Sequence, residues 1–189
     1  MREKWNRALE IVRNNSVNSA IFFTGDKEST LLLELRKGLD IPVIFVDTGF
    51  YPEEIYSYLG VAEKHWEFKA TVLIDKKVIE NSSAKGKEEC YNLLVNEIVM
   101  PSLLDKRIDT LIEPLRESKS SGEIKRVFPL IGFTDLEVWR FIREGNIPYC
   151  DLYNKGFRDV GCEPCSTAGR GEDTDQEEVK RRLKALGYL

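Results

Sequence analysis

Residues 20–30 read Ala-Ile-Phe-Phe-Thr-Gly-Asp-Lys-Glu-Ser-Thr, an apolar run that passes into a polar turn containing glycine. A short apolar run bounded by turn residues is typical of a strand that is buried on both faces of a sheet. The residues from Leu31 to Lys37 then predict a helix, and Gly38 suits its carboxyl-terminal cap. The stretch therefore predicts a strand, a turn and a helix in direct succession.

The same order of elements recurs immediately downstream. Residues 42–46, Pro-Val-Ile-Phe-Val, predict a second buried strand, which ends in Asp-Thr-Gly at residues 47–49. Pro52 then opens a helix, at a position that proline favours. Two such units indicate an α/β fold with a doubly wound parallel sheet. Because ligands of these sheets bind beyond the carboxyl ends of the strands, we expect both turns to lie at one binding edge.

Further elements are predicted on both sides of this pair. Apolar runs predict more strands, at residues 66–68, 72–74, 110–112 and 127–130. Helical spacing predicts helices, at residues 5–12, 88–100 and 134–145. The last of these opens on a Thr-x-x-Glu capping box, and a second box at 174–177 precedes a final helix. We expect a single domain over residues 1–189, with residues 146–189 as a short extension that contains cysteines.

The composition limits the classes of function. The chain has 189 residues, 42% of them hydrophobic, and a net charge of −4 without a strongly basic block. Wrapping of a long nucleic acid is therefore disfavoured, although tRNA is not excluded. The amino terminus has no signal-peptide core and no apolar run reaches the length of a membrane span, so a cytoplasmic protein is expected. The single histidine, His65, disfavours histidine-rich zinc sites and Ser-His-Asp catalysis.

The turn after the first strand contains groups that suit an anion. Backbone amides at the start of a helix point toward such a ligand. Lys27 adds a positive charge, and hydroxyl groups follow it. We expect the nucleotide-binding residues here to be Thr24, Gly25, Lys27, Ser29 and Thr30. The alternative is an ordinary entry into a helix, because short motifs of this kind are frequent.

This turn resembles the Ser-Gly-Gly-x-Asp-Ser loop of the PP-loop ATP pyrophosphatases, which are related to the phosphoadenosine phosphosulfate (PAPS) reductases. Thr24 stands for the first Ser, Asp26 for the second Gly and Glu28 for the Asp. A carboxylate at Asp26 opposes phosphate binding unless it points away. The resemblance implies nucleotide binding, and the departure at Asp26 argues against cleavage of ATP between its α and β phosphates.

Two further stretches carry the same resemblance. The Asp-Thr-Gly turn is similar to the family's second turn, which implies that Asp47, Thr48 and Gly49 flank the nucleotide. Residues 128–166 run from Phe-Pro-Leu through Val-Trp and Ile-Pro-Tyr to Gly-Cys-Glu-Pro-Cys, in the order and spacing of the family. The chain thus resembles the PAPS reductases, within the adenine nucleotide α-hydrolase group with its Rossmann-like fold.

This resemblance implies an enzyme that binds an adenylylated sulfur nucleotide and acts in sulfur transfer or reduction. The substrate would be adenosine 5′-phosphosulfate (APS), PAPS or ATP, with a thiol electron donor such as thioredoxin. Two alternatives remain open. One is an ATP-dependent sulfurtransferase or nucleotide-activating enzyme of the same fold, and the other is a non-catalytic nucleotide-binding or iron–sulfur regulatory module.

The cysteines allow more than one chemistry. Cys162 and Cys165 have the spacing of a metal-ligand pair or of a redox dithiol. The resemblance implies that they, with Cys90 and Cys150, are candidate ligands of a [4Fe–4S] cluster, although Tyr91 stands where the family has a second, adjacent cysteine. Zinc and a bare dithiol remain open. The tail cysteine that the family's reductases use as a nucleophile has no counterpart after Cys165, which leaves open a different chemistry or a nucleophile from another thiol or a partner. We expect Cys162 and Cys165 to be the catalytic residues.

The basic residues that contact phosphate or sulfonate groups are harder to select. Arg116 follows the strand at 110–112, Lys125 and Arg126 precede the Phe-Pro-Leu run, and Arg158 lies shortly before Cys162. The resemblance places a phosphate-binding arginine motif after the central strand, and only Arg116 matches it. The candidates for nucleotide contacts are Arg116, Lys125, Arg126 and Arg158, and arginine suits bidentate contacts with such anions. The alternative is that they belong to a solvated surface.

Overall fold

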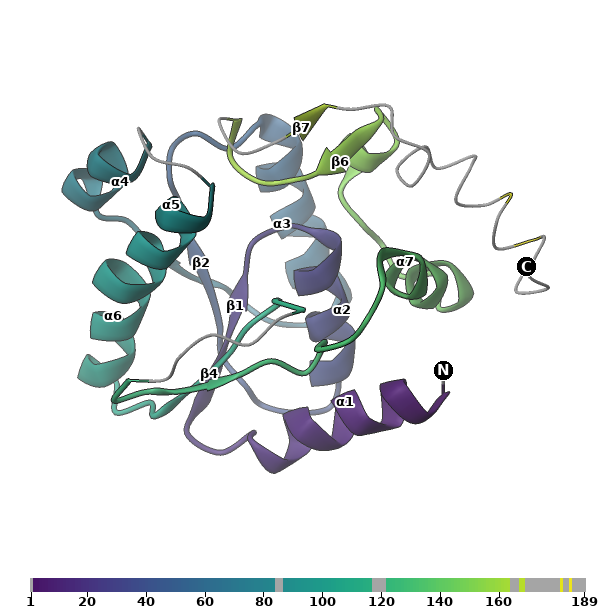
Figure 1. Ribbon diagram of the computed structural model, residues 1–189. Coiled ribbons are helices and arrows are strands. Elements are labelled where there is room, and N and C mark those ends of the chain that lie inside the picture. Colours follow the sequence, from purple (N-terminus) through teal and green to yellow (C-terminus); the bar gives the residue numbers. More distant parts are fainter. Residues whose placement is uncertain are drawn as a thin grey trace.

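A five-stranded parallel sheet in the order β3-β2-β1-β4-β5 forms the centre of the computed structural model (Figure 1). The structure describes residues 2–83, 87–116, 122–163, 167–168, 181 and 184. The strands are β1 (Ser19–Phe23), β2 (Val43–Val46), β3 (Thr71–Leu73), β4 (Thr110–Ile112) and β5 (Lys125–Val127). The prediction of an α/β fold with a parallel sheet is confirmed.

Helices cover both faces of this sheet (Figure 1). One face packs against α1 (Arg2–Asn14), α2 (Lys27–Arg36), α3 (Glu53–His65) and α7 (Asp135–Glu144). The other face packs against α4 (Lys76–Ser83), α5 (Lys87–Leu94), the π-helical η1 (Val95–Val99) and α6 (Met100–Asp105). Alternate strand residues supply the two cores, because successive side chains of a strand point to opposite faces. In β1, Ile21 and Phe23 enter the first core, whereas Ala20 and Phe22 enter the second.

The chain changes direction within the sheet at β1. From there it proceeds outward through β2 to β3, and it returns to form β4 on the other side, where Ser19 pairs with Thr110. Such a reversal leaves a crevice at the carboxyl ends of the two central strands, where ligands of open α/β sheets bind. Gly25, Thr48 and Glu113 all follow strands at this edge.

Beyond the sheet, the chain continues into η2 (Asp151–Tyr153) and a two-stranded antiparallel sheet. Its strands are β6 (Phe157–Asp159) and β7 (Thr167–Ala168). The second capping box at 174–177 and the helix predicted after it lie outside the described residues. The proposed domain and extension boundaries stay predictions. None of the described helices has the length and apolarity needed to cross a membrane.

Several boundaries differ from those that the sequence predicts. The helix predicted to stop at residue 100 continues to Asp105, because Met100 donates its N–H to Val95 in a π-helical turn and Pro101 then lies in the first turn of α6. Proline is tolerated there, since its missing N–H would have no helical partner. The strand predicted at 66–68 is wrong, because Trp66 caps α3 and Glu67 has a φ of 51°.

Candidate nucleotide site

A cavity of about 250 Å³ lies at the carboxyl edge of the parallel sheet. Its walls come from segments that are far apart in the sequence. They include the turns after β1, β2 and β4, and the segment that follows β6. The lining residues that the argument uses are Phe22, Thr24, Asp26, Glu28, Thr48, Cys90, Tyr91, Leu94, Arg116 and Cys162. The strand-end turns predicted to form one binding edge therefore do meet around one hollow.

The turn after β1 exposes few polar groups to this cavity. Asp26 caps α2, because its Oδ1 accepts the Ser29 N–H at 2.7 Å. The Asp26 carbonyl accepts the hydroxyls of Ser29 at 3.0 Å and Thr30 at 2.8 Å. These two residues are fully buried and do not line the cavity, so their hydroxyls stabilise the turn. Their role as phosphate ligands stays a prediction that this geometry does not support.

Thr24 and Gly25 differ from the rest of this turn. The Thr24 Oγ1 is buried in the cavity wall without a hydrogen-bond partner in the part of the chain that the structure describes. A buried hydroxyl in this state is costly unless a ligand or a water molecule satisfies it. Gly25 has a φ of 82°, and a Cβ there would lie 3.0 Å from Cδ1 of Ile55. Gly25 thus permits the close approach of α3, while Thr24 offers a hydrogen bond to a ligand.

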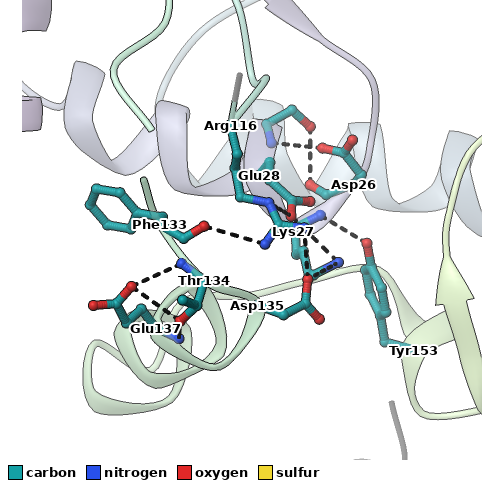
Figure 2. A network of polar contacts seen from close by, with 10 residues as sticks. Asp26, Lys27, Glu28, Arg116, Phe133, Thr134, Asp135, Glu137 and Tyr153 are labelled. Atoms are coloured by element: carbon teal, nitrogen blue, oxygen red, sulfur yellow. Dashed lines mark hydrogen bonds and ion pairs between the residues drawn. The ribbon is translucent and has the colours of Figure 1, made fainter. Parts of the chain in front are cut away.

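Four charged side chains form a compact network beside the cavity (Figure 2). The Lys27 Nζ lies 3.5 Å from Oε1 of Glu28 and 3.3 Å from Oδ1 of Asp135. The Arg116 Nε lies 3.2 Å from Oε1 of Glu28, and its Nη2 lies 3.0 Å from Oδ1 of Asp135. Glu28 and Arg116 line the cavity, whereas Lys27 is buried behind them and its backbone N–H donates to the Tyr153 hydroxyl at 2.9 Å.

Two members of the network have pKa values that are shifted from their ordinary values. Burial raises the pKa of Glu28 to about 7, although the charges of Lys27 and Arg116 act in the opposite direction. Burial by itself would lower the pKa of Lys27, but the carboxylates of Glu28 and Asp135 raise it above its ordinary value. Lys27 therefore keeps its charge at neutral pH, while Glu28 changes its charge there.

The turn after β2 closes the opposite wall. Thr48 lines the cavity, and its Oγ1 accepts the Phe50 N–H at 3.2 Å. Asp47 does not line it, and its Oδ1 accepts the Tyr56 hydroxyl at 2.7 Å and the Gly49 N–H at 2.9 Å. Asp47 and Gly49 thus shape the turn, and their direct contact with the nucleotide stays a prediction.

A buried group of polar residues beneath the cavity was not anticipated from the sequence. Glu113 is fully buried and accepts two hydrogen bonds from Arg126, one of them from Nη2 at 2.7 Å, and one from the Tyr91 hydroxyl at 2.7 Å. Burial and the Glu113 carboxylate raise the pKa of Tyr91 well above its ordinary value, so the hydroxyl remains a donor. Arg126 is a candidate for phosphate contacts in the sequence, but in the structure its guanidinium donates to Glu113. The sequence feature that could have indicated this buried group is the position of Glu113 directly after a buried strand.

The other basic candidates do not line the cavity. Lys125 begins β5, pairs in register with Thr110 at the amino end of β4, and donates its Nζ to Asn15 at 2.7 Å. This position corrects the expectation for Lys125, because the amino ends of the strands form the edge opposite the cavity. Arg158 is exposed on β6 and is not among the residues that line the cavity. Its role stays a prediction.

The cysteines do not assemble as one set. Cys90 and Cys162 both line the cavity, and Cys165 lies outside the described residues. Cys150 is fully buried in the core on the other face of the sheet from Cys90, and its Sγ contacts the Glu54 carbonyl at 3.8 Å. Burial raises the pKa of the Cys150 thiol to about 11, which makes it a poor ligand or nucleophile.

These positions test the proposed iron–sulfur cluster. Among the described residues, no three His, Cys, Asp or Glu side chains are grouped closely enough to hold a metal ion. A cluster on four cysteines would need Cys150 beside Cys90 and Cys162, and the fold keeps it on the opposite side of the sheet. A cluster with all four cysteines as ligands therefore does not fit this structure.

The structure defines an α/β domain with a cavity at the carboxyl edge of its parallel sheet, and comparisons with known proteins narrow the class. Residues 104–168 match the phosphoadenosine phosphosulfate reductase domain. The chain is 24% identical to an adenosine 5′-phosphosulfate reductase of Allochromatium vinosum, over 85% of this chain and 74% of that protein. These matches confirm the resemblance found in the motifs: the chain is similar to the PAPS and APS reductases.

Other relatives extend the comparison. An uncharacterized protein of Methanocaldococcus jannaschii is 28% identical over 88% of this chain, which spans only 39% of that longer protein. The crystal structure of a PAPS reductase from Candida auris, in a phosphate complex, superposes with a TM-score of 0.69 at 16% identity, over 85% of this chain and 90% of that one. At this identity the superposition supports the fold alone.

Proposed function

We propose that the protein binds an adenylylated sulfur nucleotide, APS or PAPS, in the cavity at the carboxyl edge of the sheet and acts on it in sulfur transfer or reduction. One observation carries this proposal. A single cavity brings together the strand-end turns, the guanidinium of Arg116 and the thiol of Cys162. Relatives named APS and PAPS reductases support the substrate class.

The cavity combines groups that suit the two parts of such a nucleotide. Phe22, Tyr91 and Leu94 give it an apolar wall that suits a purine ring. Arg116 can bind a phosphosulfate through its planar fork, and Thr24 contributes the buried hydroxyl that has no partner among the described residues. The ligand would thus lie with its base on the α5 side and its anion beside α2.

Cys162 supplies a nucleophile for the reaction. Its thiolate would attack the sulfonate sulfur, forming an S–S bond while the bond between sulfur and the phosphate oxygen breaks, and AMP leaves from APS or adenosine 3′,5′-bisphosphate from PAPS. A dithiol donor such as thioredoxin would then reduce the cysteine thiosulfonate, releasing sulfite and regenerating the Cys162 thiol as the donor is oxidised to a disulfide. Cys165 is the other candidate for this role, on grounds of sequence alone.

A second candidate function, a nucleotide-binding module without catalysis, is favoured by the charge network. Both Lys27 and Arg116 are paired with carboxylates, so part of their charge is already neutralised. The ATP-dependent alternative has less support, because the Ser29 N–H at the amino end of α2 already donates a hydrogen bond to the Asp26 carboxylate. That amide is among the groups with which a helix start would bind a phosphate.

The test combines binding with turnover. Calorimetry with APS, PAPS and ATP would be followed by assays of sulfite release, and of AMP or adenosine 3′,5′-bisphosphate release, in the presence of a dithiol donor. We expect Arg116→Ala to weaken binding and Cys162→Ser to abolish turnover while retaining binding. Arg13→Ala, which removes an exposed arginine of α1 at the other edge of the sheet, is the matched control for Arg116. Binding without turnover of any nucleotide would favour the module, and cleavage of ATP would favour the sulfurtransferase.

A further inference from the structure

Glu28 occupies a distinctive place in the charge network. It is the carboxylate that faces the cavity and is also nearly inaccessible to solvent, with an exposed side-chain fraction of 11% against 30% for Asp135. Its Oε1 is shared between Lys27 at 3.5 Å and Arg116 at 3.2 Å. Any anion that pairs with Arg116 from the cavity must therefore compete with Glu28 for the same guanidinium.

We propose that Glu28 couples ligand binding to proton uptake: when an anionic group of the ligand pairs with Arg116, Glu28 releases that guanidinium and takes up one proton from solvent. The inference rests on the proposed function, since it takes the phosphosulfate of an adenylylated nucleotide as the anion that enters. The proton moves from solvent to a carboxylate oxygen of Glu28, and no covalent bond of the ligand is involved.

Charge balance in a buried setting is the physical reason. With Glu28 ionised, two carboxylates offset the charges of Lys27 and Arg116 (Figure 2). An entering anion would leave uncompensated negative charge in a region of low dielectric, which is costly. Protonation of Glu28 removes that excess, while Asp135 keeps its contact with Lys27. Because burial already raises the pKa of Glu28 to about 7, the proton is available at neutral pH.

The groups around Glu28 act together in this coupling. From α2 itself, Asp26 opposes ionisation of Glu28 and Lys27 favours it. Arg116 from the turn after β4 favours ionisation, and Asp135 from α7 opposes it. From η2, Tyr153 lies against Lys27, and burial raises the pKa of its hydroxyl well above the ordinary value, so that group stays neutral. When a ligand occupies Arg116, the main group that favours ionisation is Lys27.

The experiment measures protons directly. Calorimetric titrations with APS would be run between about pH 6 and 8.5, in buffers that differ in ionisation enthalpy. APS is the suitable probe because its phosphosulfate lacks the ionisation near pH 6 that a phosphate monoester has. We expect an uptake that approaches about one proton per APS above pH 7, and an affinity that falls by up to about tenfold per pH unit there.

Two matched variants isolate the residue. Glu28→Gln should abolish the proton uptake and make the affinity for APS independent of pH over this range. Arg13→Ala removes an exposed charge from α1 at the other edge of the sheet and leaves the network unchanged, so it should bind APS with proton uptake intact. If Glu28→Gln does not fold, difference infrared spectra of the wild-type protein should show a protonated carboxyl band that appears with APS, and the absence of this band would overturn the inference.

The experiment distinguishes a failure of the proton coupling from a failure of the proposed function. If APS binds without proton uptake, or if Glu28→Gln retains the uptake, the coupling is overturned and the proposed function stands. If neither APS nor PAPS binds at any pH while the protein is folded, the proposed function is overturned, and the inference with it. If only PAPS binds, the comparison of the wild type with Glu28→Gln is made with PAPS.

Discussion

Glu28 also contributes to the way in which the folding stability of this protein depends on pH. The pKa of its carboxyl is about 7 in the folded chain, above the ordinary value of 4.5, so the folded state holds this proton more tightly than the unfolded state. The stability from this difference is complete below about pH 4.5 and is lost as the pH rises through about 7. Glu28→Gln removes the titration.

We therefore expect the free energy of unfolding of the wild-type protein, relative to Glu28→Gln, to fall by up to about 3 kcal/mol between acidic pH and pH 8. Urea denaturation of both proteins at matched pH values measures this difference. A gap between the two proteins that stays constant with pH would show that Glu28 titrates in the folded state as it does in the unfolded chain.

The buried pair of Glu113 and Arg126 should matter greatly when only one member is removed. Arg126→Met leaves the Glu113 carboxylate buried with the Tyr91 hydroxyl as the remaining partner that the structure shows. We expect a loss of about 3–5 kcal/mol in the free energy of unfolding, measured by urea denaturation. The double variant Glu113→Gln with Arg126→Met should recover a large part of the loss. A single variant as stable as the wild type would contradict this account.

At the scale of elements, the start of α2 decides what the first turn can bind. Asp26→Gly restores the glycine of the related phosphate loops and releases the Ser29 N–H, and its backbone (φ −80°, ψ 173°) is open to glycine. Replacing such a cap by glycine costs only a few tenths of a kcal/mol. We expect the variant to bind ATP and pyrophosphate more tightly than the wild type does, as measured by calorimetry.

Asp26→Asn is the control for this change, because it keeps a capping oxygen while it removes the charge. If the occupied amide is the obstacle, Asp26→Asn should gain less affinity than Asp26→Gly. Equal gains would assign the effect to charge alone, and no gain in either variant would show that anions do not approach α2 in this protein.

The elements that could be predicted from the sequence are those whose own residues determine them. The central strands β1 and β2 are buried on both faces, so each is an uninterrupted apolar run. The start of α7 is equally local, since Thr134 and Glu137 form the predicted capping box with both hydrogen bonds present. In contrast, the continuation of the helix through Pro101 depends on the π-helical turn before it, which no local pattern indicated.

The candidate site could be predicted in position but not in detail. The order of strands and turns placed the first two turns at one edge, and the cavity lies there. The direction of individual side chains was not predictable, because α2 begins at Lys27 and not at Leu31, which turns Ser29 and Thr30 inward. The pairing of Glu113 with Arg126 arises only when β5 lies beside β4.

At the scale of the whole molecule, the cavity joins the parallel sheet to the segment around β6. The Glu163 N–H donates to the Phe50 carbonyl at 2.7 Å, which ties that segment to the turn after β2. Ligand binding stabilises the segments that it contacts. We expect APS to slow amide hydrogen exchange at residues 48–51 and 159–163, with no change in α1 at the other edge. Protection that is equal in all three segments would place the ligand elsewhere.

The central position of β1 has a consequence for how the chain is made. Its register with β4 joins Ser19 to Thr110, so one side of this strand has no neighbour until more than half of the protein has been synthesised. Meanwhile β1 is an apolar strand with an open edge, the type of segment that associates between chains. Fragments that end before β4 should aggregate during translation, and completion of the sheet by β4 is therefore the event that protects the nascent protein.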